Sequence, residues 1–83
     1  MFSQCKYVVL SQVDEYGCVN DNMFIFNSSV THKTVAQNLK GKAISAGFVK
    51  KSEDGEYYCC GRSISLNISS REVDTILLEL LLK

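Results

Sequence analysis

The residues best suited to chemistry are four cysteines and a single histidine: Cys5, Cys18, Cys59, Cys60 and His32. Thiolates and imidazoles bind zinc, and a structural zinc site usually takes two ligands from one C-x2-4-C turn. The sequence has no such turn, and the adjacent Cys59 and Cys60 would point to opposite faces of a strand. No C-x-x-C of the thioredoxin type occurs either. We therefore interpret the cysteines as small buried apolar residues and expect no metal ion or cofactor.

Two catalytic alternatives remain open. One is a thiol- or metal-dependent site that uses Cys59 or Cys60 together with His32. The other is a small hydrolase in which His32 is the general base, which would require a neighbouring nucleophile and an orienting carboxylate. No serine lies in the G-x-S-x-G context of a nucleophile elbow. We expect no catalytic residue, and we expect His32 to have a surface or capping role at the start of a helix.

Composition limits the classes of function. Nine Lys+Arg balance nine Asp+Glu in 83 residues, so the formal net charge is zero. A generic nucleic-acid binder would need an excess of basic side chains to neutralise phosphates, so nucleic acid is not an expected partner. Hydrophobic residues make up 46 %, too many for a disordered chain, and the length predicts one small domain over residues 1–83.

The N-terminal residues do not form a signal peptide, and the apolar block at 76–82 is too short to span a membrane. These features predict a cytoplasmic protein that does not interact with a membrane.

The secondary-structure signals occur in the same order in each half of the chain. The first half predicts strands over Lys6–Val13 and Cys18–Phe26, then a short helix that ends near Gly41. The second half predicts a strand over Ala43–Lys51, a hairpin turn, and a long return strand over Glu56–Ile68 that bends at Gly61. A final helix is predicted over Arg71–Leu82, with Ser69 and Glu72 as its capping box.

This order, ββαββα, predicts an α+β fold with a mostly antiparallel four-stranded sheet and two helices on one face. The paired serines Ser28-Ser29 and Ser69-Ser70 stand before the helix of each half, which suggests an internal ββα duplication. Alternatively, any two ββα units would need turn and cap residues at similar places.

The final helix carries an unusual number of leucines. Its apolar residues at i, i+3, i+4, i+7 and i+8 spacing are expected to cover the sheet; they are Val73, Ile76, Leu77, Leu80 and Leu81. Leu78 and Leu82 lie outside the centre of this stripe, so a second copy of the chain is expected to cover them. Leu78, Leu82 and Leu81 are the interface candidates.

Together these observations favour a small non-enzymatic module that binds other proteins or regulates them, and that self-associates as a homodimer, binds another protein, or both. An accessory protein of a phage or other mobile element would fit this description.

Overall fold

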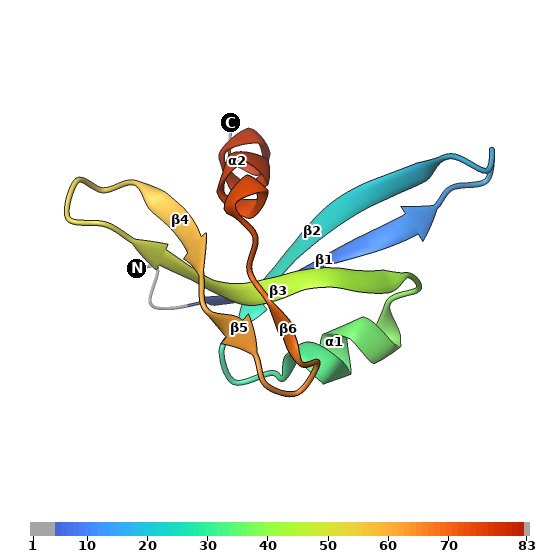
Figure 1. Ribbon diagram of the computed structural model, residues 1–83, viewed down its shortest axis with the longest axis horizontal. Helices are drawn as coiled ribbons and strands as arrows, with labels where there is room; N and C mark the ends of the chain where they lie inside the picture. The colour runs from blue at the N-terminus through green and yellow to red at the C-terminus, as the bar shows by residue number, and fades with distance from the viewer. Residues whose placement is uncertain (1–4, 83) are drawn as a thin grey trace.

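The computed structural model describes residues 5–82, which form two helices and six strands of an α+β fold (Figure 1). This confirms the predicted class. The elements are, in order, β1 (Cys5–Val13), β2 (Val19–Asn27), α1 (His32–Asn38), β3 (Lys42–Lys51), β4 (Tyr57–Cys60), β5 (Arg62–Ser63), β6 (Ile68–Ser69) and α2 (Glu72–Leu81). Within this range no helix is long and apolar enough to cross a membrane.

Four of the strands form an antiparallel sheet in the order β2-β1-β3-β4. β1 and β2 make the longest hairpin, which is paired in register from Cys5 opposite Asn27 to Val13 opposite Val19. The turn between them ends at Gly17, whose φ of +82° is a left-handed conformation that glycine adopts without strain. β1 therefore lies inside the sheet, with a partner on each side.

The two helices cover opposite faces of this sheet, with α2 above it and α1 below it in Figure 1. Successive residues of a strand point to opposite faces. On one face Tyr7 and Val9 pack with Leu78 of α2, and on the other face Val8 and Leu10 pack against α1. The prediction of both helices on one face is wrong, because β1 is apolar at every position from residue 7 to residue 10 and both faces need cover.

The predicted return strand Glu56–Ile68 is broken. β4 ends at Cys60, and Gly61, with a φ of +78°, turns the chain out of the four-stranded sheet, so the predicted bend is confirmed. Residues 64–67 then form the turn of a second, two-stranded sheet made by β5 and β6. The order is therefore ββαββββα, and Ile64 is 88 % exposed instead of lying on the inner face of a strand.

The helix positions also bear on the proposed duplication. In a ββα duplication, a two-fold rotation would exchange β1 with β3. Because these neighbouring strands are antiparallel, the axis of that rotation would be perpendicular to the sheet, and both helices would lie on the same face. The opposite placement of α1 and α2, and the β5–β6 hairpin that has no counterpart in the first half, do not fit a simple ββα repeat.

Candidate functional site

The side of α2 that faces the sheet is marked by its two fully buried residues, Asp74 and Leu78. They lie four residues apart and so on one face of the helix. Leu78 belongs to the core cluster of Tyr7, Val9 and Val49. The predicted outward position of Leu78 is therefore wrong, and in the folded protomer this leucine is covered by the sheet.

Asp74 is held by a buried polar cluster at the beginning of α2. The Tyr7 hydroxyl donates a hydrogen bond of 2.5 Å to Asp74 Oδ2, and Arg71 forms an ion pair of 2.9 Å with Asp74 Oδ1. The backbone N–H of Arg71 also donates to Asp74 Oδ2, at 2.9 Å, so Asp74 caps the start of the helix two residues beyond the predicted Glu72. These bonds fix the helix in rotation as well as in position.

Two further features tie this cluster to the sheet. Burial and the neighbouring Asp74 raise the pKa of the Tyr7 phenol, so that the hydroxyl keeps the proton it donates. Thr75, the residue after Asp74, accepts through Oγ1 a hydrogen bond of 3.1 Å from the backbone N–H of Cys59 on β4. Polar bonds to β1 and β4 thus dock α2 on the sheet beside the apolar contact of Leu78.

Most of the apolar stripe of α2 is consequently exposed, while Leu77 also packs against the core cluster. Of its members, Val73, Ile76, Leu80 and Leu81 are 43 %, 56 %, 61 % and 54 % exposed, and Leu77 is half-buried. We call these five residues the outer stripe. Their spacing was predicted correctly, but their direction was not, because Asp74 and Leu78 occupy the inner face. Leu82, the remaining interface candidate, is 51 % exposed at the end of the helix.

The outer stripe continues into a groove of about 530 Å³ between α2 and the β1–β2 hairpin. Leu77, Leu80 and Leu81 line it from the helix, and Met23 and Asp21 line it from β2. β2 is an edge of the four-stranded sheet, so the groove and this strand edge are adjacent. The exposed apolar residues of α2 therefore adjoin a groove of mixed lining, in which Gln12 and Asn22 stand beside Met23.

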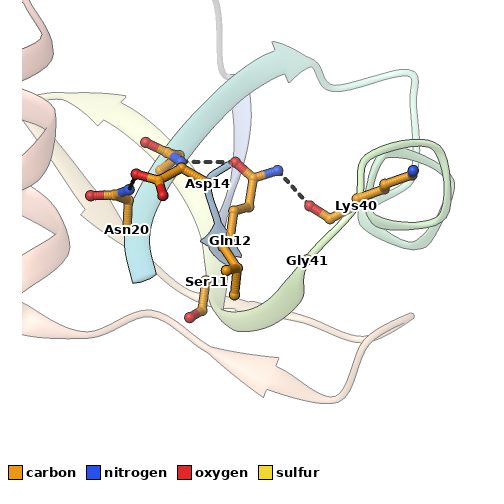
Figure 2. A pocket seen from close by; sticks show the side chains of 8 residues that line it. Ser11, Gln12, Asp14, Asn20, Lys40 and Gly41 are labelled. Atoms are coloured by element: carbon orange, nitrogen blue, oxygen red, sulfur yellow. Dashed lines mark hydrogen bonds between the residues drawn. The ribbon is translucent and has the colours of Figure 1, made fainter. Parts of the chain in front are cut away.

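A polar pocket of about 510 Å³ lies near the turn of the β1–β2 hairpin and shares Gln12 and Asn22 with this groove (Figure 2). Its side chains bind one another: Asn22 Nδ2 donates to Gln12 Oε1 at 2.8 Å, and Gln12 Nε2 donates to the carbonyl of Lys40. Asp14 accepts a hydrogen bond of 3.3 Å from Asn20 across the turn. These bonds connect the hairpin to the segment between α1 and β3, so we interpret the polar side chains of this pocket as structural.

His32 is buried below the sheet, with 3 % of its surface exposed, so the predicted surface or capping role is wrong. Thr31 caps α1 instead, accepting a hydrogen bond from the backbone N–H of Thr34. The imidazole stands edge-on to Phe26 and Phe48, and Nε2 bonds the Gly47 carbonyl at 2.8 Å. Burial lowers the pKa of His32, and the nearby Lys6 adds to this effect.

The cysteines do not gather around His32. Cys59 packs in the core on the α2 side, while alternation along β4 directs Cys60 to the other face. Burial and the proximity of Asp74 raise the pKa of the Cys59 thiol to about 12, which keeps it protonated and unreactive at neutral pH. Across residues 5–82, no group of three His, Cys, Asp or Glu side chains could hold a metal ion.

Comparisons with protein-family models, with curated proteins and with solved structures found no match for this chain. The residues that sequence analysis missed are Tyr7, Arg71 and Asp74. The available signal was Asp74 itself, a carboxylate four residues before a leucine in a helix rich in apolar residues.

Proposed function

We propose that this protein is a non-enzymatic interaction module that self-associates through the outer stripe of α2. One observation carries the proposal. Four large apolar side chains of one helix, Val73, Ile76, Leu80 and Leu81, are about half exposed, while Asp74 and Leu78 hold the helix on the sheet. Exposed apolar surface of this regularity is typical of an interface between proteins.

A second copy of the chain is the partner that fits the chemistry of the surface. The outer stripe contains no charged residue, and a two-fold axis through it would place leucine and isoleucine side chains against their own counterparts. The formal net charge of zero means that two copies repel each other little as they approach. A strongly charged partner would find no complementary group on the stripe itself.

The expected strength of association follows from the exposed area. Full burial of such a side chain contributes about 1.5–3 kcal/mol, so covering the exposed half of each contributes about 1 kcal/mol. Four residues on each of two protomers then give roughly 8 kcal/mol, which lies inside the range of about 4–15 kcal/mol that association costs. We therefore expect a weak and reversible dimer, with Leu77 and Met23 of the groove adding to the contact.

Sedimentation equilibrium from low micromolar to millimolar protein concentration tests the proposal. The wild-type mass should rise from 9.3 kDa towards twice that value as the concentration increases. Leu80→Glu should stay monomeric, since it places a charge at the centre of the outer stripe. Val19→Glu is the matched control, because Val19 is 64 % exposed but lies at the beginning of β2, away from the stripe.

Two results would contradict the proposal. The first is a wild-type protein that remains monomeric at the highest concentration. The second is a dimer that Leu80→Glu and Val19→Glu weaken equally, which would place the contact elsewhere. A cytoplasmic location and a role as an accessory protein of a mobile element remain predictions from the sequence.

A further inference from the structure

A separate cavity of about 630 Å³ opens on the α1 side of the sheet, on the face opposite the outer stripe. It is bounded by β1, the start of α1, β3 and the β5–β6 hairpin, and its lining residues are Lys6, Thr31, His32, Phe48, Gly61, Arg62, Ile64 and Ser65. Cavities of about 300–1,000 Å³ are the size that small molecules occupy in proteins. We call this cavity the His32 pocket.

The charged groups that line the His32 pocket have one sign. Lys6 and Arg62 are both cationic, and no carboxylate is among the lining residues. Lys6 Nζ donates a hydrogen bond of 3.1 Å to the Val30 carbonyl, and Arg62 Nη2 donates one of 2.8 Å to Asn67 Oδ1. A lysine has three N–H donors and an arginine has five, so each anchored side chain keeps donors for a ligand.

The rest of the wall is largely apolar. Phe48 contributes an aromatic ring, and Ile64, at 88 %, is among the most exposed large apolar residues of the described chain. A side chain at position 61 would bring its Cβ within 3.0 Å of the Phe48 ring, so glycine is what lets the chain pass this close. The pocket thus combines two anchored cations with an apolar wall.

His32 lines the pocket, so a ligand bound there would lie near its ring and change its NMR signals. Its ring donates through Nε2, because the Gly47 carbonyl to which it is bonded can only accept. This assigns Nδ1 as the nitrogen that titrates. Burial lowers the pKa of the ring, which favours the neutral imidazole.

We propose that the His32 pocket binds a small carboxylate with an apolar body, whose carboxylate faces Lys6 and Arg62 while the body lies against Phe48 and Ile64. The charge of the lining selects an anion over a cation or a neutral molecule of the same shape. The volume of about 630 Å³ suits a small molecule. This binding is independent of self-association, because the pocket and the outer stripe lie on opposite faces of the sheet.

Octanoate is a suitable probe, with octylammonium and octanol as analogues of equal length that carry a positive charge or none. His32 is the only histidine of the chain, so its imidazole signals can be followed by NMR without further assignment. Octanoate should shift these signals saturably and raise the pKa of His32, since a nearby carboxylate stabilises the imidazolium. Octylammonium and octanol should bind at least tenfold more weakly.

Two charge reversals locate the binding. Arg62→Glu should weaken the octanoate response at least tenfold, while Lys42→Glu, the same change at an exposed position outside the pocket, should leave it unchanged. Both positions are exposed, and backbone amide spectra that keep the wild-type dispersion in the ligand-free variants would show that the fold is retained. The proposal is overturned if octanoate gives no saturable shift, if all three probes act alike, or if the two variants lose binding equally.

Discussion

The two helices cover the two faces of one sheet by different means. α1 does so mainly with apolar side chains: Val35, Ala36 and Leu39 pack against Val8 and Leu10, beside the buried His32. α2 instead turns a carboxylate and one leucine towards the sheet and leaves its longest apolar stripe outside. The difference shows that the number of apolar residues on a helix face does not decide which face docks.

The reason lies in what each face of the sheet presents. Above the sheet, the hydroxyl of Tyr7 is buried and needs a partner, and Asp74 supplies it. Turning α2 so that the outer stripe faced the sheet would leave Tyr7 without its acceptor and move the Arg71–Asp74 pair. A buried polar group without a partner is destabilising by about 1–3 kcal/mol, comparable with the gain from burying another leucine.

The largest expected effect comes from removing the carboxylate. Asp74→Ala should lower the free energy of unfolding by about 3–5 kcal/mol, because it leaves Tyr7 and Arg71 without their shared partner. Glu79→Ala, a change at an exposed acid of the same helix, should shift it by less than about 0.5 kcal/mol. Urea unfolding at low protein concentration measures both, and equal stabilities would refute the polar docking of α2.

A smaller effect should separate two leucines of the same helix. Leu78→Ala should lower the free energy of unfolding by about 2–5 kcal/mol, as expected for a fully buried leucine. Leu80→Ala should change it by less than about 0.5 kcal/mol when measured at a concentration where the protein is monomeric. If Leu80→Ala proved the more damaging change, α2 would have to be docked through its outer stripe.

The smallest effect concerns the buried polar group on the α1 side. The pKa of His32 is lowered by folding, so below the unfolded value of about 6.5 the unfolded chain binds more protons than the folded one. Stability should therefore be full above that pH and fall as the pH drops below it, by at most about 1.4 kcal/mol per unit.

His32→Gln removes this titration and should flatten the unfolding free energy between about pH 6.5 and pH 5. Asp14 has a lowered pKa because it accepts backbone hydrogen bonds from Cys18 and Tyr16, and its stabilisation is lost only at lower pH, as the carboxylate protonates. A wild-type slope that persists unchanged in His32→Gln would show that the imidazole is not the responsible group.

Most of the local structure could be predicted from the sequence. Strands β1 and β3, the turn at Gly17 and the extent of α2 follow from neighbouring residues alone. The direction of the outer stripe does not, because it depends on Tyr7 and Asp74, which are 67 residues apart. The same holds for His32, whose burial depends on Phe26 and Phe48 from two different strands. Long-range pairs of this kind leave no periodic signal in a single sequence.

The prediction of one long return strand was also wrong. The break after Cys60 has a local cause that can be found in the sequence. Gly61 indicates a bend, whereas the alternation of Ile64, Leu66 and Ile68 with polar residues is typical of a strand that continues past it. In the structure Asn67 adopts a positive φ of 55°, a conformation that asparagine tolerates better than most residues. An alternating apolar pattern next to a glycine and an asparagine can therefore mark a hairpin in place of a continuous strand.

The central claim is that α2 keeps Leu78 on the sheet and offers its outer stripe to a second copy of the chain. Isotope-filtered NOE spectroscopy tests it on a millimolar mixture of ¹³C-labelled and unlabelled protein. The account predicts intermolecular NOEs from the methyl groups of Val73, Ile76 and Leu80, and only intramolecular NOEs from Leu78. Intermolecular NOEs that come from the β2 edge alone, or none at all, would contradict it.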